Sequence, residues 1–278
     1  MEECKMSERI KRLEQQCYEM KLKALDMAFG SNFGAHIGGG FSLMEIMASL
    51  YEIANIPSMK DKSRDRIIMS KGHGVLALYT ALWKKGVITE EELDTFEKDG
   101  TMFHGHPHRN LDKGLEFSGG SLGLGLSYAV GVAKACKMKG LKNTIYVLVG
   151  DGEMNEGIVW ESLMSIAHFG LNNIVLIVDK NGYQLDGPTD EVMGLSSIEN
   201  KLIAFGFDVE TIDGHSIEAL LETLPKKSAK PRAIVANTIK AHGISFLENN
   251  KSSHQCVLTK KKYEQAVAEI KEAYCYGE

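Results

Sequence analysis

Residues 147–181 decide the fold of this chain: VLVGDGEMNEG at 147–157, a connecting segment, and IVLIVDKN at 174–181. The apolar runs at 144–149 and 173–178 predict two buried strands, and the apolar stripe through Ile158, Leu163 and Ile166 predicts a helix between them. Two parallel strands joined by one helix form a right-handed crossover, so both strands end at the same edge of the sheet. Asp151 and Asn181 therefore meet at the carboxyl edge, where open α/β sheets bind ligands.

The residues at this edge suit a cation and an anion together. Carboxylate and amide oxygens, here from Asp151 and Asn181, are ligands that Mg²⁺ accepts. Gly150 and Gly152 let the backbone approach a bulky anion, and the amino end of the following helix favours negative charge. A Gly-Asp-Gly turn alone also fits a carboxylate that merely caps a helix. Asn181 at the end of the second strand favours the cation site.

The runs GDGEMNEGIVWES at 150–162 and DKNGYQLDG at 179–187 resemble the thiamin diphosphate enzymes, and specifically transketolase. The resemblance implies that Asp151, Asn181 and the backbone carbonyl of Tyr183 hold Mg²⁺, or another divalent cation such as Ca²⁺ or Mn²⁺, against the diphosphate of the cofactor. Further cofactor contacts are implied for Gly150, Gly152 and Glu153. Lys180 departs from the Asn or Asp that the family carries here, at a position that need not be a ligand.

Four histidines stand in segments that resemble further transketolase motifs. The segments are GAHIGG at 34–39, SKGHG at 70–74, HGHPH at 104–108, and the surroundings of His254, where Ser253 and Gln255 replace the family's Trp and Gly. The resemblance implies catalytic roles for His36, His73, His106 and His254, with His73 and His254 also touching the cofactor. Histidine suits the proton transfers of this chemistry, because its pKa lies near working pH. The glycines at 38–40 predict irregular backbone that approaches another group closely.

The glycine-rich segment SGGSLGLG at 118–125 resembles the family's TGSLGQG, which implies that Gly120, Ser121 and Leu122 contact the cofactor. Gly119 and Leu124 replace Thr and Gln, which removes two hydrogen-bonding side chains. A dinucleotide-binding turn is the competing interpretation, but the apolar run before it is too short and no acidic residue follows at the expected place.

Two other features keep simpler or rival interpretations open. The resemblance implies that Glu156 takes part in an activation relay between neighbouring sites, whereas a Glu at a helix amino end also stabilises the helix dipole. His104, His106 and His108 alternate as zinc ligands on a strand would, although Gly105 and Pro107 make this segment a poor strand. A metal hydrolase built on these three histidines remains a rival hypothesis.

Composition narrows the class of protein. The 278 residues are 44% hydrophobic and 25% charged, with a net charge of −5 and no basic stripe, which argues against a nucleic-acid binder. The five cysteines are scattered and typical of reduced thiols. A charged amino-terminal segment and the lack of an 18-residue apolar run predict a cytoplasmic protein without a membrane span.

The remaining pattern alternates helices with strands. We expect a helix at 7–29 capped by Ser7, one from about 43, a strand at 65–69 and a helix at 89–98. A helix at 126–139, strands at 207–212 and 233–237, and helices at 198–205, 216–223 and 257–274 follow. This predicts an α/β protein with a doubly wound, mostly parallel sheet and helices on both faces. We expect one thiamin diphosphate-binding domain of the PP type over 1–278, with an amino-terminal helical extension at about 7–52.

The resemblance runs from about residue 10 to 270 and covers only the diphosphate-binding half of a transketolase. It implies a transferase of the pentose phosphate pathway that moves a two-carbon ketol unit from a ketose phosphate to an aldose phosphate. It also implies activity only with a separate carboxy-terminal subunit that carries the pyrimidine-binding domain, in a heterotetramer. Two alternatives stay open: ketol transfer on a modified sugar, such as a sulfonated or deoxy sugar, and a non-catalytic cofactor-binding subunit.

Overall fold

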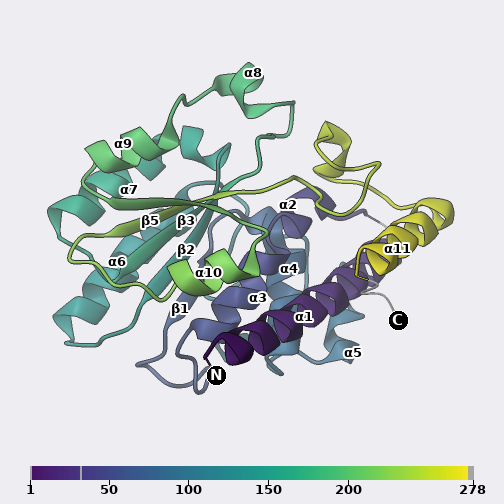
Figure 1. The fold of residues 1–278 in the computed structure, drawn as a ribbon, viewed down its shortest axis with the longest axis horizontal. Coiled ribbons are helices and arrows are strands. Elements are labelled where there is room, and N and C mark those ends of the chain that lie inside the picture. The colour runs from purple at the N-terminus through teal and green to yellow at the C-terminus, as the bar shows by residue number, and fades with distance from the viewer. Residues whose placement is uncertain (1, 32, 275–278) are drawn as a thin grey trace.

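The computed structural model describes residues 2–31 and 33–274 (Figure 1). Its centre is a five-stranded sheet in the order β1-β2-β3-β5-β4. The strands are β1 (Arg66–Met69), β2 (Ile145–Gly150), β3 (Ile174–Lys180), β4 (Asp208–Asp213) and β5 (Arg232–Asn237). Every pairing within this sheet is parallel. The predicted parallel, doubly wound sheet is confirmed.

The register of the strands aligns the ends that carry the candidate site. Gly150 of β2 lies opposite Asp179 of β3, and Lys180 of β3 lies opposite Asn237 of β5. Asp151, Asn181 and the segment after β5 therefore leave the sheet at the same edge.

Helices cover both faces of the sheet, as predicted. Alternate residues of β2 belong to different cores, because successive side chains of a strand point to opposite faces: Val147 and Val149 to one, Tyr146 and Leu148 to the other. On the first face the core is closed by α6 (Leu124–Met138), α7 (Gly157–His168) and α9 (Ile198–Ala204). Burial on both faces explains why the central strands are apolar without interruption.

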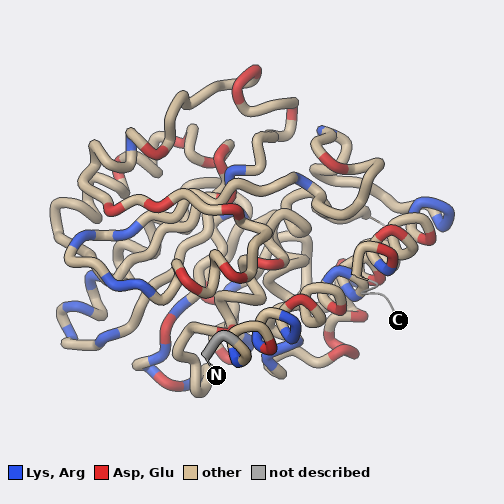
Figure 2. Tube along the Cα trace, viewed as in Figure 1, with Lys and Arg blue, Asp and Glu red and all other residues tan. Residues whose placement is uncertain are grey.

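The second face carries a thicker helical layer. It contains α1 (Glu2–Gly30), α3 (Met44–Ile53), α4 (Val75–Lys84), α10 (Ile217–Thr223) and α11 (Lys260–Tyr274). The long α1 buries one stripe, which includes Leu13, Cys17, Met20 and Ala24, and α11 lies alongside it (Figure 1). Acidic and basic residues are interspersed along both of these helices (Figure 2). No helix of the described residues combines the length and apolar character that a membrane span requires.

Short elements connect the main helices and strands. They are α2 (Ile37–Phe41), α5 (Glu90–Leu93), α8 (Thr189–Met193) and the 3₁₀ turns η1 (Gly72–Gly74), η2 (Leu111–Lys113), η3 (Glu153–Asn155) and η4 (Lys251–Ser253). Neither α2 nor α8 was predicted, because elements of five residues carry too little periodicity to be recognised.

Three local predictions are wrong. Helix α1 begins at Glu2, so Ser7 lies inside the helix and does not cap it. The expected helix 89–98 ends at Leu93, where the capping box of Thr89 and Glu92 supports one turn only. The glycines at 38–40 lie within α2: a Cβ at Gly39 would come 2.5 Å from the His73 ring, so close packing rather than irregular backbone demands them.

Candidate active site

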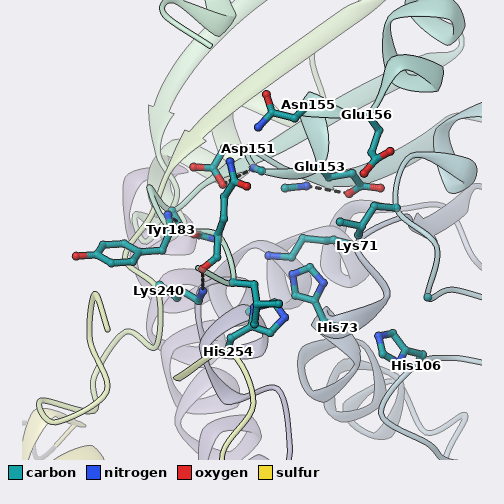
Figure 3. A pocket seen from close by; sticks show the side chains of 18 residues that line it. Lys71, His73, His106, Asp151, Glu153, Asn155, Glu156, Tyr183, Lys240 and His254 are labelled. Atoms are coloured by element: carbon teal, nitrogen blue, oxygen red, sulfur yellow. Dashed lines mark hydrogen bonds between the residues drawn. The ribbon is translucent and has the colours of Figure 1, made fainter. Parts of the chain in front are cut away.

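A cavity of about 300 Å³ opens at the carboxyl edge of the sheet (Figure 3). Every site residue predicted from the sequence lines it except His36 and Ser121. The cavity also has lining residues that the sequence analysis did not identify, among them Lys71, Gln184 and Lys240. In Figure 3, Asp151 and Tyr183 lie toward one side and His106 toward the other.

Asp151, directly after β2, is buried and firmly held. Its Oδ2 accepts hydrogen bonds from the Gly182 N–H at 2.8 Å and the Thr189 hydroxyl at 3.1 Å, and its Oδ1 accepts one from the Gly152 N–H at 2.9 Å. Burial, and then the nearby Asp179 carboxylate, raise the pKa of Asp151. A cation bound nearby would stabilise the ionised form of this carboxylate.

Asn181 presents its amide in a defined orientation. Its Nδ2 donates to Asp179 Oδ2 at 3.1 Å, and its Oδ1 accepts from the Tyr183 N–H at 3.1 Å. The amide oxygen keeps a second lone pair for another partner. Lys180 points elsewhere, since its Nζ pairs with Glu199 of α9 at 2.8 Å. The set of Asp151, Asn181 and the Tyr183 backbone carbonyl consists of oxygen donors and fits a hard divalent cation.

A fully buried ion pair stabilises this edge of the sheet. Lys71 and Asp179 are both 0% exposed and form a salt bridge. Asp179 also accepts hydrogen bonds from Ser42 at 2.7 Å and from Thr238. Burial alone would raise the pKa of Asp179, but Lys71 outweighs it and holds this pKa below its usual value. Neither residue is predicted from the sequence, although each lies two positions from a predicted site residue.

Lys240 is the buried cation with capacity to bind. It is 2% exposed, and its Nζ donates to the Gln184 carbonyl at 2.9 Å. That is its one hydrogen bond to the described residues, so two of the three N–H groups of its ammonium remain for a ligand. Burial, and then Lys71, lower the pKa of Lys240 to about 8. An anion in the cavity would stabilise its charged form, and a diphosphate fits this requirement.

Glu153 anchors the glycine-rich turn. This buried carboxylate accepts hydrogen bonds from the Ser70 hydroxyl, from the Gly123 N–H at 2.7 Å and from the Gly150 N–H at 3.0 Å. Burial raises its pKa. Glu153 therefore ties the ends of β1 and β2 to the turn before α6, and a direct contact with a cofactor stays a prediction.

The glycine-rich turn itself packs backbone against backbone. A Cβ at Gly119 would lie 2.9 Å from the Gly72 Cα, and a Cβ at Gly72 would lie 2.8 Å from the Gly120 nitrogen. This packing leaves no room for the family's Thr at position 119. Leu124, in place of the family's Gln, is 42% exposed at the start of α6.

Four predicted histidines gather in one cluster. Ring centroids are 5.0 Å apart for His36 and His106, 5.4 Å for His36 and His254, and 5.2 Å for His73 and His254. His36 thus belongs to the cluster although it does not line the cavity. Burial first, and then neighbouring cationic or histidine groups, lower the pKa values of His36 and His254 to about 4. Burial likewise lowers the pKa values of His73 and His106.

These histidines are therefore neutral at pH 7 and can accept protons. The Nδ1 of His36 is buried and has no hydrogen-bond partner within 2–31 and 33–274. A buried polar atom of this kind needs a partner, which a ligand would supply.

The rival zinc hypothesis has no geometric support. The ring centroids of His104 and His108 are 5.2 Å apart, with the two rings tilted, while the ring of His106 lies against His36. The one group of three close ligand-type side chains in the described part of the chain lies elsewhere.

Glu156 lies exposed at the rim, as the residue before α7, and its side chain makes no capping hydrogen bond. The position of Glu156 at the amino end of α7 leaves the helix-dipole alternative open, and its role in a relay stays a prediction.

The fold and this carboxyl edge are those of proteins that bind thiamin diphosphate. The chain belongs to the transketolase family: residues 15–277 match the family described as transketolase, thiamine diphosphate binding domain. The predicted relationship to transketolase, a transferase, and the predicted cofactor-binding domain are confirmed. The divalent cation stays a prediction.

Individual relatives support this assignment. The chain is 41% identical to a 6-deoxy-6-sulfo-D-fructose transketolase subunit from a Clostridium species (strain MSTE9), over 84% of this chain and 88% of that protein. It is 37% identical to an apulose-4-phosphate transketolase subunit of Phocaeicola vulgatus, over 95% of both chains.

Among solved structures, the transketolase of Campylobacter jejuni superposes with a TM-score of 0.85 at 30% identity. That match covers 93% of this chain and 42% of the other, so this chain spans less than half the length of that transketolase.

Proposed function

We propose that this protein is the cofactor-binding subunit of a split transketolase that acts on a modified ketose. The support comes from relatives that it matches over most of their length, two of which are named for 6-deoxy-6-sulfo-D-fructose and for apulose-4-phosphate. Ordinary sugar phosphates of the pentose phosphate pathway are the second candidate, because transketolases without such a qualifier are also similar to this chain.

The observation that carries the proposal is the chemistry of one cavity. It combines oxygen donors for a cation on Asp151 and Asn181, spare donors for an anion on Lys240, and a cluster of neutral histidines. When bound, thiamin diphosphate would supply the electron sink for cleaving and forming the bond to the two-carbon unit.

The residues of this chain would bind, orient and move protons. Asp151, Asn181 and the Tyr183 carbonyl would hold a divalent cation, and Lys240 would bind the diphosphate together with the main chain of Gly120. The remaining predicted cofactor contacts are Ser121, Leu122, Gly150, Gly152, Glu153, His73 and His254.

The histidines His36, His73, His106 and His254 would take protons from substrate hydroxyl groups and return them, since each is neutral before it does so.

We further propose that a second subunit completes the site, in a heterotetramer located in the cytoplasm. The relatives cited above for modified sugars are described as subunits, which supports a division of the enzyme between chains. Glu156, exposed at the rim of the cavity, would then face the partner chain.

The test is a two-carbon transfer assay on the purified chain, with and without its companion subunit, in the presence of thiamin diphosphate and Mg²⁺. The donors are apulose 4-phosphate, 6-deoxy-6-sulfofructose and an ordinary ketopentose phosphate, each with the same aldose phosphate acceptor. We expect activity only with both subunits, and the largest kcat/KM for one of the two modified ketoses. The highest kcat/KM on the ordinary ketopentose phosphate would replace the proposal by the second candidate.

Equal turnover by this chain alone would refute the split site. A non-catalytic role is tested in the same assay: if the variants His73→Ala and His106→Ala left the activity of the complex unchanged, this chain would only bind cofactor.

A further inference from the structure

A second, partly buried polar cluster lies between α1, α3 and α10. Glu45 of α3 is 4% exposed, and its Oε1 pairs with Lys21 of α1 at 2.7 Å. The other oxygen, Oε2, lies 3.0 Å from Nδ1 of His215, in the turn between β4 and α10. His242 stacks on His215 with ring centroids 3.7 Å apart. A cavity of about 410 Å³ adjoins these groups.

The cluster resembles a metal site, but its bonding opposes one. The ligand atoms of Glu45, His215 and His242 lie within 4.8 Å of one another. The ammonium of Lys21 is 1% exposed and already forms a salt bridge with Glu45. A metal ion bound here would therefore be repelled by a buried positive charge. Both ring nitrogens of His215 are also engaged, Nδ1 by Glu45 and Nε2 by the Ile239 N–H.

His215 joins this cluster to the main chain beside Lys240. Its Nε2 accepts a hydrogen bond from the Ile239 N–H at 2.9 Å. Because Nε2 is an acceptor, the ring proton resides on Nδ1 and is donated to Glu45. Glu45 therefore selects the tautomer and ring orientation that allow His215 to hold the Ile239 N–H.

The segment held in this way delivers Lys240 to the active-site cavity. After β5, the Thr238 hydroxyl donates to Asp179, and the Ala241 N–H donates to the Gly38 carbonyl at 3.0 Å. Ala241 has a φ of 62°, a left-handed conformation that is unfavourable for a residue with a Cβ. The turn therefore needs outside contacts to persist, and the bond to His215 lies one residue before Lys240.

We propose that His215, oriented by Glu45, is a positioning residue that aims the Lys240 ammonium at the cofactor diphosphate. The inference rests on the proposed function, since it concerns binding in the same cavity. It assigns a role to a cluster that touches neither substrate nor cofactor.

Two variants separate the two contacts of His215. In His215→Gln, the side-chain oxygen can replace Nε2 as acceptor for the Ile239 N–H while the Glu45 contact is lost. In His215→Asn, the side-chain amide can replace Nδ1 as donor to Glu45 while the Ile239 N–H loses its acceptor. The measurement is calorimetric titration of thiamin diphosphate into the complex with the companion subunit, at saturating Mg²⁺. Circular dichroism melts confirm that each variant is folded at the titration temperature.

We expect His215→Asn to raise the Kd of thiamin diphosphate about tenfold, because the loosened turn misplaces Lys240. His215→Gln should stay within about threefold of the parent, although its melting temperature falls with the loss of the Glu45 contact. The reverse order of affinities, or equal affinities for both variants and the parent, would overturn the inference. If His215→Asn fails to fold, the affinity of His215→Gln is decisive. A parent-like affinity supports the inference, and a loss of affinity overturns it.

A double-mutant cycle with Lys240→Met tests whether the effect passes through Lys240. In the Lys240→Met background, His215→Asn should change the Kd by less than about twofold, because the ammonium that it positions is gone. Independent, additive losses would show that His215 acts only on general stability. A parent complex that binds no thiamin diphosphate would refute the proposed function itself, which this design distinguishes from a failure of the inference alone.

Discussion

Removal of the Asp151 carboxylate is the most direct perturbation of the site. Asp151→Ala deletes the acceptor of the Gly182, Gly152 and Thr189 hydrogen bonds. In the parent, the carboxylate is buried and its pKa is raised, so its ionised form is stabilised most when a cation is present. The variant should therefore lose little stability without ligand and much affinity with it.

The magnitude follows from the burial of the charge. Breaking a buried charge pair by removing one partner costs about 3–5 kcal/mol. At 1.4 kcal/mol per factor of ten, the Kd of thiamin diphosphate with Mg²⁺ should rise roughly a hundredfold to a few thousandfold. Without ligand, the free energy of unfolding of the variant should differ from that of the parent by no more than about 2 kcal/mol. The lost hydrogen bonds are offset by the removal of an unpaired buried charge.

Calorimetric titration of the complex with thiamin diphosphate and Mg²⁺ measures the affinity, and urea unfolding measures the stability. Asp190→Ala is the matched control, since it removes an exposed carboxylate from the neighbouring α8. Its Kd should stay within about twofold of the parent. An unchanged affinity in Asp151→Ala would show that Asp151 only supports the local backbone, and the cation site would have to be abandoned.

Three further predictions address the histidines and the close packing. His106→Ala should lower kcat roughly a hundredfold or more. His108→Ala should lower kcat less than about threefold, because the His108 side chain is exposed outside the cavity. The opposite order in steady-state kinetics would show that the proton-transfer role has been assigned to the wrong histidine. Burial first, and then Lys21, lower the pKa of His242 to about 4, so between about pH 6.5 and 4 the unfolded chain binds a proton that the folded chain does not. Stability should thus fall as pH falls through this window, and urea titrations should give a shallower slope for His242→Gln; an identical slope would contradict the shifted pKa. Gly39→Ala should lower kcat at least tenfold, because its Cβ would displace the imidazole of His73, to which we assign proton transfer. Gly131→Ala, at a helix position with open space, should stabilise the fold by about 0.4–1 kcal/mol at unchanged kcat. Equal kinetics for the two variants would refute the packing argument.

The sequence by itself determined the sheet and the meeting of Asp151 with Asn181. A strand buried on both faces must be apolar throughout, and β2 and β3 satisfy this over 145–149 and 174–178. The single connecting helix makes the two strands parallel, so their carboxyl ends share one edge, as the pairing of Gly150 with Asp179 shows. These are local patterns combined with a general rule of chain connection, so no tertiary detail was required.

Where the local pattern was weak, the predictions failed. The charged residues before Ser7 continue α1 although they show little apolar periodicity, and the glycines of α2 are helical despite their intrinsic cost. In α2 the packing of Gly39 against His73 and of Gly38 against Ser253 outweighs helix propensity. Propensity is a small local term, whereas a Cβ at Gly38 or Gly39 would force a neighbouring segment to shift.

Only the tertiary structure decided which charges became buried and which partners they found. Lys71 and Asp179 are separated by 108 residues, and His215 meets Glu45 across 170 residues. In the sequence, each of these residues is an ordinary charged or polar side chain in a loop or at an element's end. Their roles arise because folding removes them from water, where an unpaired charge is tolerable, into an interior where it must be paired. Lys240 keeps donors without a partner among the described residues for the same reason, and that shortage, which no local pattern records, is what prepares the cavity for an anion.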